Sequence, residues 1–385
     1  MYPGLTTGAI EAIEISGSDQ QKALFLPNMV SGRWTGTMNL TEPHCGTDLG
    51  LLRTKAEAQT DGSYRITGTK IFISAGEHDL TENIIHLVLA KIPGGPEGVK
   101  GISLFIVPKY WVEADGRLGA RNAISCDALE EKMGIHGNAT CSMRYDGAVG
   151  YLLGEAHKGL ATMFIMMNAA RLAVAVQGLS QAEAAYQHAL AYCKERLQGR
   201  SLRGAQYPDQ SADPLIVHPD IRRMLMTVKV FQEGARALAY WSGVTVDIIR
   251  KHPDAEARQK AEDLLGLLTP VMKAYFTDMG FISTNLCLQC LGGHGYIVDS
   301  GMEQFVRDAR ITQIYEGANG IQALDLVGRK LPAHKGRAIQ LMFGIVQGFC
   351  EKYADNAALS PFVKPLADAL ERLVTATRWL MQHAV

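Results

Sequence analysis

The spacing of hydrophobic and polar positions changes near residue 37 and again near residue 157. Residues 1–36 have a helical pattern that is interrupted by polar breaks at "SGSD" and "SGRW". Between the two changes, "GSYRITGTKIFISAG" alternates, while "NIIHLVLAKI" and "GISLFIVPKYW" are short apolar runs separated by the turn "PGGPEGVKG". Short runs bounded by glycine and proline are typical of β-strands and hairpins, so we expect a β domain here.

After residue 157 apolar residues recur at i, i+3 and i+4, which is typical of amphipathic helices. The stretch 199–217 contains several Gly and Pro residues, and we expect a long loop or a flexible excursion there. The predicted helices cover residues 157–198, 219–251, 255–291, 318–330, 336–355 and 361–384. The whole pattern predicts an α+β protein in which a β domain is followed by a helical bundle.

Composition and charge narrow the classes of protein that fit this pattern. The chain has 385 residues, enough for two or three domains, and its net charge of −1 gives no reason to expect nucleic acid as a partner. The seven cysteines are an odd number and widely spaced, which favours a reducing compartment over a disulfide scaffold. We see no signal-peptide pattern and no apolar run of the ~20 residues that a membrane span needs. We therefore expect a cytoplasmic protein without a membrane span.

One carboxylate, Glu316, stands at a junction in "RITQIYEGANGIQALDLVGRKL", residues 310–331. It follows an apolar run and precedes Gly317 and a helical pattern. It could be an acid near a helix N-terminus, where the helix dipole favours negative charge. It could also be a general base, because loss of hydration raises the pKa of a carboxylate towards neutral pH.

Two further segments contain residues that could take part in chemistry. "MNLTEPHCGTDLG", residues 38–50, is either a tight turn or a binding loop. It includes His44 and Cys45, but adjacent ligands without a second pair are weak evidence, so we expect no metal site. "CLQCLGGHGY", residues 287–296, is either the end of a helix or a backbone that approaches a phosphate closely.

Five segments, in this order, together resemble the acyl-CoA dehydrogenase family: "LTEPHCGTDLG", "GTKIFISAG", "EEKMGIHGNATCSMRYDGAVGYLLGEAHKG", "QCLGGHGY" and "RDARITQIYEGANGIQ". The resemblance extends from about residue 10 to residue 331. The spellings "TEPHCGTDLG" and "IYEGANGIQALDLVGRKL" are most similar to the longer bacterial members. That group includes the 3-(methylthio)propanoyl-CoA dehydrogenases of dimethylsulfoniopropionate degradation.

The resemblance implies a central β-barrel or β-sandwich domain followed by a C-terminal helical bundle. The family's N-terminal helical domain does not fit into the residues before the β domain, so we expect only its last part here, and a chain that is either a fragment or a protein whose gene start was misplaced. The expected domains are a remnant of the N-terminal helical domain (1–36), the middle β domain (37–155), the C-terminal bundle (156–331) and an additional helical segment (332–385).

The resemblance also implies a reaction. Glu316 corresponds to the base that removes the α-proton of an acyl-CoA thioester, and Gly317 leaves room for the substrate. The β-hydrogen leaves as hydride to N5 of FAD, and the product is a trans-2-enoyl-CoA. We expect a short or medium acyl-CoA, with 3-(methylthio)propanoyl-CoA as a candidate, and an electron-transfer flavoprotein or a similar protein as electron acceptor.

Binding residues follow from the same resemblance, position by position. On the β domain, the expected flavin contacts are Leu40, Thr41, Thr47, Phe72 and Ser74, with Thr47 also at the CoA entrance. Asn168 and Arg171 lie three residues apart, and therefore on one helix face, where relatives hold the adenosine end of CoA. The residues expected to reach the FAD of a neighbouring subunit, and so to require a homodimer or homotetramer, are Arg196, Gln289, Gly292 and Gly293.

Two alternatives remain beside the dehydrogenase. One is a flavin oxidase or monooxygenase of the same fold, which Glu316 disfavours because such relatives usually replace the base. The other is a non-catalytic dehydrogenase-like fragment or binding protein, and a flavin band that bleaches with acyl-CoA would distinguish it from an enzyme.

Overall fold

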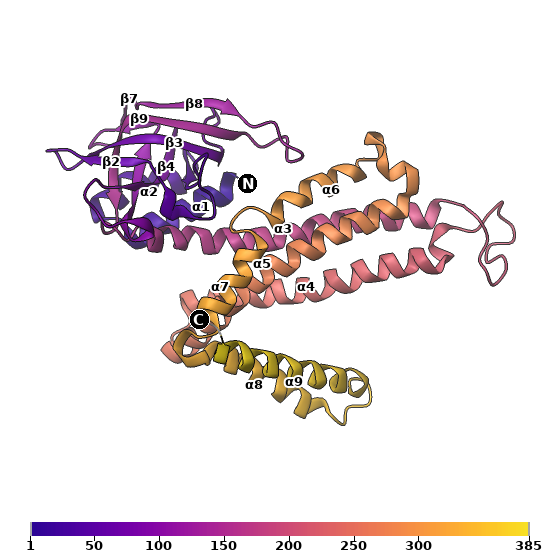
Figure 1. Ribbon diagram of the computed structural model, residues 1–385. Coiled ribbons are helices and arrows are strands. Elements are labelled where there is room, and N and C mark those ends of the chain that lie inside the picture. Colours follow the sequence, from indigo (N-terminus) through magenta and orange to yellow (C-terminus); the bar gives the residue numbers. More distant parts are fainter. Residues whose placement is uncertain (1, 384–385) are drawn as a thin grey trace. The chain divides into compact units, whose positions relative to one another are not determined.

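The computed structural model describes residues 2–383 and divides into two compact units, Met1–Ala173 and Val174–Val385 (Figure 1). The first unit contains two helices and all the strands, and the second is helical. The long helix α3 (Gly159–Glu195) contributes its first part to one unit and the rest to the other. The α+β class predicted from the pattern is confirmed.

Two helices precede the sheet, α1 (Tyr2–Ser16) and α2 (Asp19–Val30). The chain breaks between them because Ser18 and Gln21 form a reciprocal capping box at the start of α2. α1 approaches β1 closely, since an added Cβ at Gly36 would lie 2.5 Å from the Cβ of Ala9. This contact fixes the helix against the first strand of the barrel.

Seven of the strands form a closed sheet, and β6 and β7 pair separately as a two-stranded sheet. The neighbours are ordered β1-β4-β2-β3-β9-β5, β8 pairs with β9, and β4 also pairs with β5, which closes the ring. The central strand β4 has eight buried residues in succession, and this explains its continuous apolar run. The strands are β1 (Trp34–Asn39), β2 (Lys55–Ala58), β3 (Tyr64–Ser74), β4 (Asn83–Lys91), β5 (Ile102–Pro108), β6 (Tyr110–Val112), β7 (Leu118–Arg121), β8 (Ile124–Leu129) and β9 (Thr140–Leu153). The expected β-barrel is therefore present.

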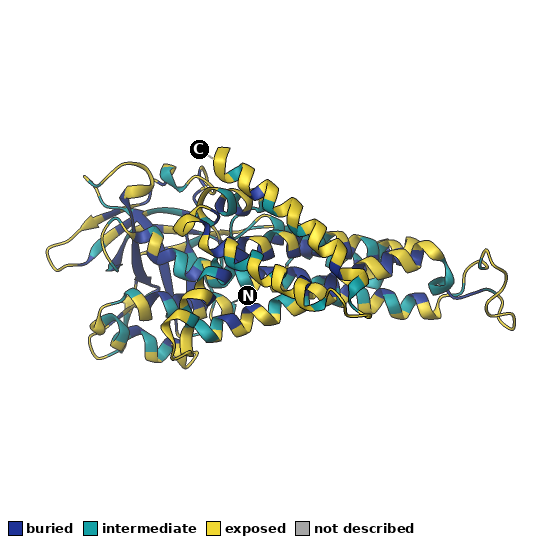
Figure 2. Cartoon of the chain, turned by 90° about the horizontal axis from the view of Figure 1, so that it is seen from below, coloured by how far each residue is buried: buried dark blue, intermediate teal, exposed yellow. Residues whose placement is uncertain are grey.

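The second unit is a bundle in which α4 runs alongside α5, and α3 crosses α5 at very short range. Figure 2 shows buried residues along the inner sides of the long helices and exposed residues along their outer sides. At the crossing of α3 with α5, a Cβ added to Gly178 would lie 2.6 Å from the carbonyl oxygen of Phe276, so only glycine fits there. The remaining helices are α4 (Pro219–Lys251), α5 (Ala255–Leu291), α6 (Met302–Arg310), α7 (Asn319–Asp325), α8 (Arg337–Tyr353) and α9 (Ser360–His383).

The stretch 199–217 is a loop, as expected, but the buried Asp213 organises it. Its carboxylate accepts hydrogen bonds from the backbone N–H groups of Ser201, Gln206 and Tyr207 and from Arg200. These bonds, with that of Ser201 the largest, lower the pKa of Asp213 to about 2. The side chain of Asp213 thus replaces the hydrogen-bond partners that a helix or strand would supply.

Among the described residues, α3 is the one helix long and apolar enough to cross a membrane by length and composition. A single helix of this kind is weak evidence, because the core helix of a soluble protein meets the same criteria.

Candidate active site

Glu316 lies in a short connection between a 3-10 turn (Ile311–Gln313) and α7. It is half-buried, its φ is 55°, and Gly317 follows with a φ of 85°. Two successive left-handed residues reverse the chain sharply, and Gly317 supplies the second at no steric cost. For the non-glycine Glu316 such a backbone costs roughly 1–3 kcal/mol and persists only where the surroundings hold it.

Side chains on both sides hold this turn. Gln322, which is 1% exposed, donates through Nε2 to the carbonyl oxygens of Gly317 at 2.9 Å and Glu316 at 3.3 Å. The hydroxyl of Tyr315 donates to Gln177 on α3. Burial, and to a smaller degree the charge of Glu316, raises the pKa of Tyr315 above its usual range, so the hydroxyl stays protonated and can donate.

The position of Glu316 disfavours the helix-terminus interpretation. α7 begins at Asn319 with Ala318 as its N-cap, and no side chain caps it. Glu316 therefore lies outside the first turn, beyond the range in which the helix dipole stabilises an acid best.

A second site region lies on the β domain, where Glu42 and Lys70 form a buried ion pair. The Glu42 carboxylate accepts from Lys70 Nζ at 2.9 Å and from the backbone N–H groups of Arg53 and Thr54 at 2.8 and 3.0 Å. Burial acts to raise the pKa of Glu42, but the Lys70 charge and these hydrogen bonds lower it below its ordinary value. Burial lowers the pKa of Lys70 to about 8.

Lys70 also holds the loop that is expected to face the flavin. Its Nζ donates to the carbonyl oxygen of Leu40 at 2.9 Å, and the N–H of Ile71 donates to the carbonyl oxygen of Thr41 at 2.9 Å. The loop is therefore attached to β3 at both predicted flavin-contact positions.

Phe72 and Ser74 lie on the same strand. Phe72 is in an irregular part of β3, with a φ of 61°, and its side chain is among the exposed hydrophobic ones at 60%. Ser74 Oγ accepts from Asn138 Nδ2 at 3.3 Å. Thr47, the remaining predicted contact on this domain, is exposed in the loop next to Asp48. An exposed aromatic ring on a strained backbone fits a binding role better than a packing role.

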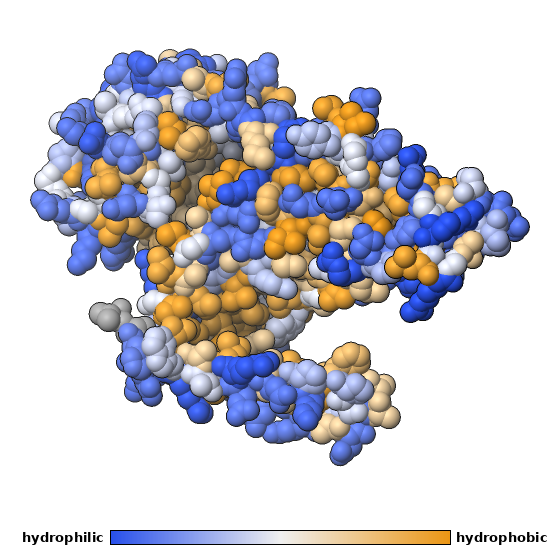
Figure 3. Space-filling view, turned by 45° about the vertical axis from the view of Figure 1, so that its right-hand side comes forward, coloured by the Kyte–Doolittle hydropathy of each residue, from blue (hydrophilic) through white to orange (hydrophobic). Residues whose placement is uncertain are grey.

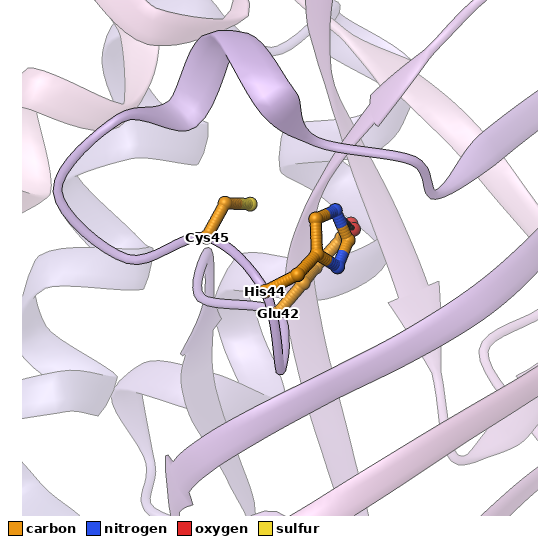
Figure 4. Close-up of side chains that lie close together, drawn as sticks. All are labelled: Glu42, His44 and Cys45. Carbon is orange, nitrogen blue, oxygen red and sulfur yellow. Dashed lines mark ion pairs between the residues drawn. The ribbon is translucent and has the colours of Figure 1, made fainter.

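Glu42, His44 and Cys45 place one possible ligand atom each within 4.8 Å of one another (Figure 4). His44 Nε2 lies 3.7 Å from Glu42 Oε2 and 2.9 Å from the carbonyl oxygen of Leu51. Burial, with the charge of Glu42, raises the pKa of the Cys45 thiol, which disfavours the thiolate that binds metals. Since the Glu42 oxygens already accept hydrogen bonds from Lys70 and the backbone, this group fits an ion pair better than a metal site.

The two residues expected to bind CoA lie together on α3, as their spacing predicts. Arg171 Nη1 is 3.5 Å from Asn168 Oδ1, and the guanidinium lies over the ring of Phe164 at 5.7 Å. Arg171 is only 6% exposed. Its role towards CoA stays a prediction.

The four residues expected to reach a neighbouring subunit are exposed at one end of the bundle. Arg196 directly follows α3, Gln289 is in the last turn of α5, and Gly292 and Gly293 follow it. The ends of α3 and α5 are in contact next to these residues, where Cys193 Sγ lies 4.0 Å from the carbonyl oxygen of Cys290. Segments far apart in sequence therefore present one surface.

The residues that hold the site were not predicted from the sequence. Lys70 lies in "GTKIFISAG" and Lys273 in the apolar helix 255–291, and both side chains are fully buried. A lysine on the apolar face of a helix was the available signal, because a buried charge needs a partner.

Comparisons with known proteins show the family to which the chain belongs. Residues 37–148 match the model of the acyl-CoA dehydrogenase middle domain, and residues 157–331 match that of the acyl-CoA dehydrogenase C-terminal domain. The 3-methylmercaptopropionyl-CoA dehydrogenase of Ruegeria pomeroyi is 48% identical over 96% of this chain, which spans 62% of that relative's length. An acyl-CoA dehydrogenase of Bacillus subtilis is 32% identical over 80% of this chain and 71% of its own length. The crystal structure of Megasphaera elsdenii butyryl-CoA dehydrogenase superposes with a TM-score of 0.69 at 28% identity, over 85% of this chain and 76% of that one.

Proposed function

Because the chain belongs to the acyl-CoA dehydrogenase family, we propose that it oxidises an acyl-CoA thioester to a trans-2-enoyl-CoA with Glu316 as the catalytic base. The observation that carries this proposal is the turn at Glu316. An ionisable residue is held half-buried in a left-handed conformation, outside the helix that follows. Strained backbone of this kind is concentrated at active sites.

In the proposed reaction, Glu316 takes up a proton and Gly317 leaves space for the acyl group. The Glu316 carboxylate accepts the α-proton and becomes a carboxylic acid, while the β-hydrogen leaves with its electron pair and the Cα–Cβ bond becomes double. Bound FAD supplies the oxidant that takes this hydride. Polarisation of the thioester carbonyl by hydrogen-bond donors makes the α-proton acidic enough for a carboxylate to remove. Gly317 adds no side chain where the acyl group would lie.

The β domain has residues that fit a flavin. The exposed ring of Phe72 offers a flat apolar surface, and the neighbouring loop is held at Leu40 by Lys70 and at Thr41 by the backbone N–H of Ile71. Thr47 and Ser74 supply hydroxyl groups near the same strand and loop. We assign FAD to this surface, with Asn168 and Arg171 for the CoA end of the substrate.

The relatives also suggest a substrate and partners. The Ruegeria pomeroyi relative is named for 3-methylmercaptopropionyl-CoA, which supports that thioester, or another short or medium acyl-CoA, as the substrate. An electron-transfer flavoprotein would reoxidise the flavin. Arg196, Gln289, Gly292 and Gly293 would contact the FAD of a second copy in a homodimer or homotetramer. We place the reaction in the cytoplasm.

Substitution of Glu316 by Gln tests the proposal. The amide is nearly isosteric but cannot accept the α-proton at neutral pH. Anaerobic mixing of the FAD-loaded variant with acyl-CoA should bleach the flavin ~10²–10⁴ times more slowly than the wild type, as is typical when a general base is lost. Acyl-CoA affinity should change far less than this rate.

Glu262→Gln, a change at an exposed position on α5, is the matched control and should bleach at the wild-type rate. Bleaching of Glu316→Gln at the wild-type rate contradicts Glu316 as the base. A wild-type protein that binds FAD and acyl-CoA without bleaching supports the non-catalytic alternative. Stoichiometric use of oxygen with each turnover supports the oxidase or monooxygenase alternative.

A further inference from the structure

Asn319, three residues after Glu316, is bound between two charged residues of α5. Its side-chain oxygen accepts from Lys273 Nζ at 2.9 Å. Its side-chain nitrogen donates to Asp278 Oδ1 at 2.7 Å and to Thr277 Oγ1 at 3.0 Å. The amide therefore has its oxygen towards the cation and its nitrogen towards the anion.

This orientation is the one that the charges permit. Reversal of the amide would direct its N–H groups at an ammonium group and its oxygen at a carboxylate. Lys273 is fully buried, and so is Thr277, so water does not screen the arrangement effectively. These hydrogen bonds therefore fix the orientation of the Asn319 side-chain amide, and with it the position of the backbone where α7 begins.

Asp278 also holds the other flank of the turn. Gln313, three residues before Glu316, donates through Nε2 to the same oxygen, Oδ1, at 2.6 Å. Asp278 thus binds one residue on each side of Glu316, and α5 fixes both ends of the left-handed turn. Two anchors at equal distance along the chain restrict the direction in which the intervening backbone can move.

We propose that Lys273 and Asp278 are positioning residues for Glu316, which act through Asn319 and Gln313 to aim the carboxylate. The inference rests on the proposed function, because it concerns the rate at which Glu316 removes a proton. Neither residue has to touch the substrate. Displacement of a reacting group by about 1 Å can cost ~10²-fold in rate, so a loosened turn should slow chemistry without weakening binding.

The sharpest test exchanges the amide of Asn319 and the carboxylate of Asp278. Asn319→Asp keeps an oxygen for Lys273 but replaces the nitrogen that donates to Asp278 with a second oxygen, so this side of the contact becomes repulsive and the turn should loosen at its Asp278 anchor. The double change Asn319→Asp with Asp278→Asn restores one amide and one carboxylate. The amide nitrogen at position 278 can donate to the new carboxylate, and the Gln313 amide can turn so that its oxygen accepts from the same nitrogen. The exposed Asn356→Asp, in the connection between α8 and α9, is the matched control.

The single change should slow flavin reduction ~10–10²-fold and raise the kinetic isotope effect of α-deuterated acyl-CoA, while the Kd of the enoyl-CoA product stays within ~3-fold. Hydrogen exchange at residues 313–319, measured without FAD or acyl-CoA, should become faster. The double change should recover both the rate and the protection. A purely structural role would alter the thermal midpoint and leave the isotope effect unchanged.

Wild-type rate and isotope effect in the folded single variant overturn the inference, and so does a folded double variant that stays slow. If Asn319→Asp does not fold, Gln313→Leu decides, because it removes only one bond to Asp278 and should still slow reduction several-fold. Failure of the proposed function gives a different result, since Glu316→Gln would then bleach normally. A slow Glu316→Gln beside unaffected Asn319 and Gln313 variants refutes only the positioning.

Discussion

At the scale of single residues, two buried lysines each hold a segment that the proposed reaction would use. Lys70 holds the Leu40 carbonyl on the β domain, and Lys273 holds Asn319 in the bundle. An ammonium group without exposed surface requires strong partners, because its desolvation costs several kcal/mol. Each lysine has such partners next to a segment that the family resemblance assigns to the reaction. We infer that both lysines serve the geometry of these segments rather than stability.

Lys70 makes the free energy of unfolding depend on pH in a predictable direction. Its folded pKa is about 8, below the ordinary value of 10.5. Between these values the unfolded chain keeps a proton that the folded chain has released, so stability rises with pH through this window and is flat below it. From pH 8 to pH 10 the contribution of Lys70 to the free energy of unfolding should grow by roughly 2 kcal/mol. The slope cannot exceed about 1.36 kcal/mol per pH unit for a single titrating group.

Denaturant unfolding at several pH values measures this slope, with Lys70→Met as the comparison. The variant lacks the titrating group, so the difference between the two proteins should change across pH 8–10. The exposed Lys100→Met is the matched control and should run parallel to the wild type. If the free energies of unfolding of the wild type and Lys70→Met changed in parallel with pH, the lowered pKa of Lys70 in the folded protein would be wrong.

The sequence indicates Glu316 as the candidate base but does not indicate the side chains that hold its turn. Glu316 is recognisable because it stands alone at a junction and within a family motif. The buried Lys273 signals that a partner is needed but does not indicate which one. The Asn319 partner of Lys273 and Asp278 is 46 and 41 residues away, and the helical pattern gives no register between α5 and the turn. Contacts of this kind depend on how helices pack, which a periodic pattern does not specify.

At the scale of elements, the contact of α3 with α5 positions the turn at Glu316. The close approach at Gly178 and Gly280 brings Gln177 and Thr277 to the segments that they bind, Tyr315 and Asn319 respectively. Glycines at both helices allow this distance, because any side chain there would meet backbone atoms. The position of the turn at Glu316 therefore depends on how closely these two glycines let α3 and α5 approach.

Gly178→Ala should separate the two helices. The added Cβ would lie 2.6 Å from the Phe276 carbonyl oxygen and should lower the free energy of unfolding by about 1–3 kcal/mol. Flavin reduction should slow as well, because Gln177 moves away from Tyr315. Gly243→Ala on α4 is the matched control, since nothing lies within 4 Å of its added Cβ, and it should stabilise by ~0.5–1 kcal/mol. Equal stabilities of the two variants in denaturant unfolding would refute the crossing argument.

The pattern predicted long elements well and short ones poorly. The segments 219–251 and 255–291 coincide with α4 and α5 because Pro219 and Asp254 provide clear helix starts. α6 was missed because it is only nine residues long and Gly301 precedes it instead of a capping side chain. β2, "KAEA", was missed because three of its four residues are exposed and their propensity for strands is low. Tertiary pairing, which the sequence does not show, determines such elements.

For the whole molecule, the exposed apolar surface of the bundle suggests association with a second copy. A groove of about 590 Å³ between α4 and α5 is lined mainly by apolar side chains, among them Met226, Val230 and Tyr275, which are more than half exposed. Figure 3 shows apolar side chains among the polar ones on the helical unit. Patches of this kind mark interaction sites in soluble proteins. The proposed contacts of Arg196 and Gln289 with a neighbouring FAD would place a cofactor in the same assembly.

Association and FAD binding should therefore be linked. A ligand that binds only the assembled form stabilises it by mass action, so FAD should shift the protein towards the oligomer in sedimentation velocity. Val230→Glu places a charge in the groove and should raise both the dissociation constant of the oligomer and the Kd for FAD, each by ~10-fold if the change costs about 1.4 kcal/mol. Leu202→Glu is the matched control, since Leu202 is 94% exposed in the loop and should leave both quantities unchanged. A monomeric Val230→Glu that binds FAD as tightly as the wild type would show that the cofactor site is complete within one copy, and Arg196 and Gln289 would then lose their proposed role.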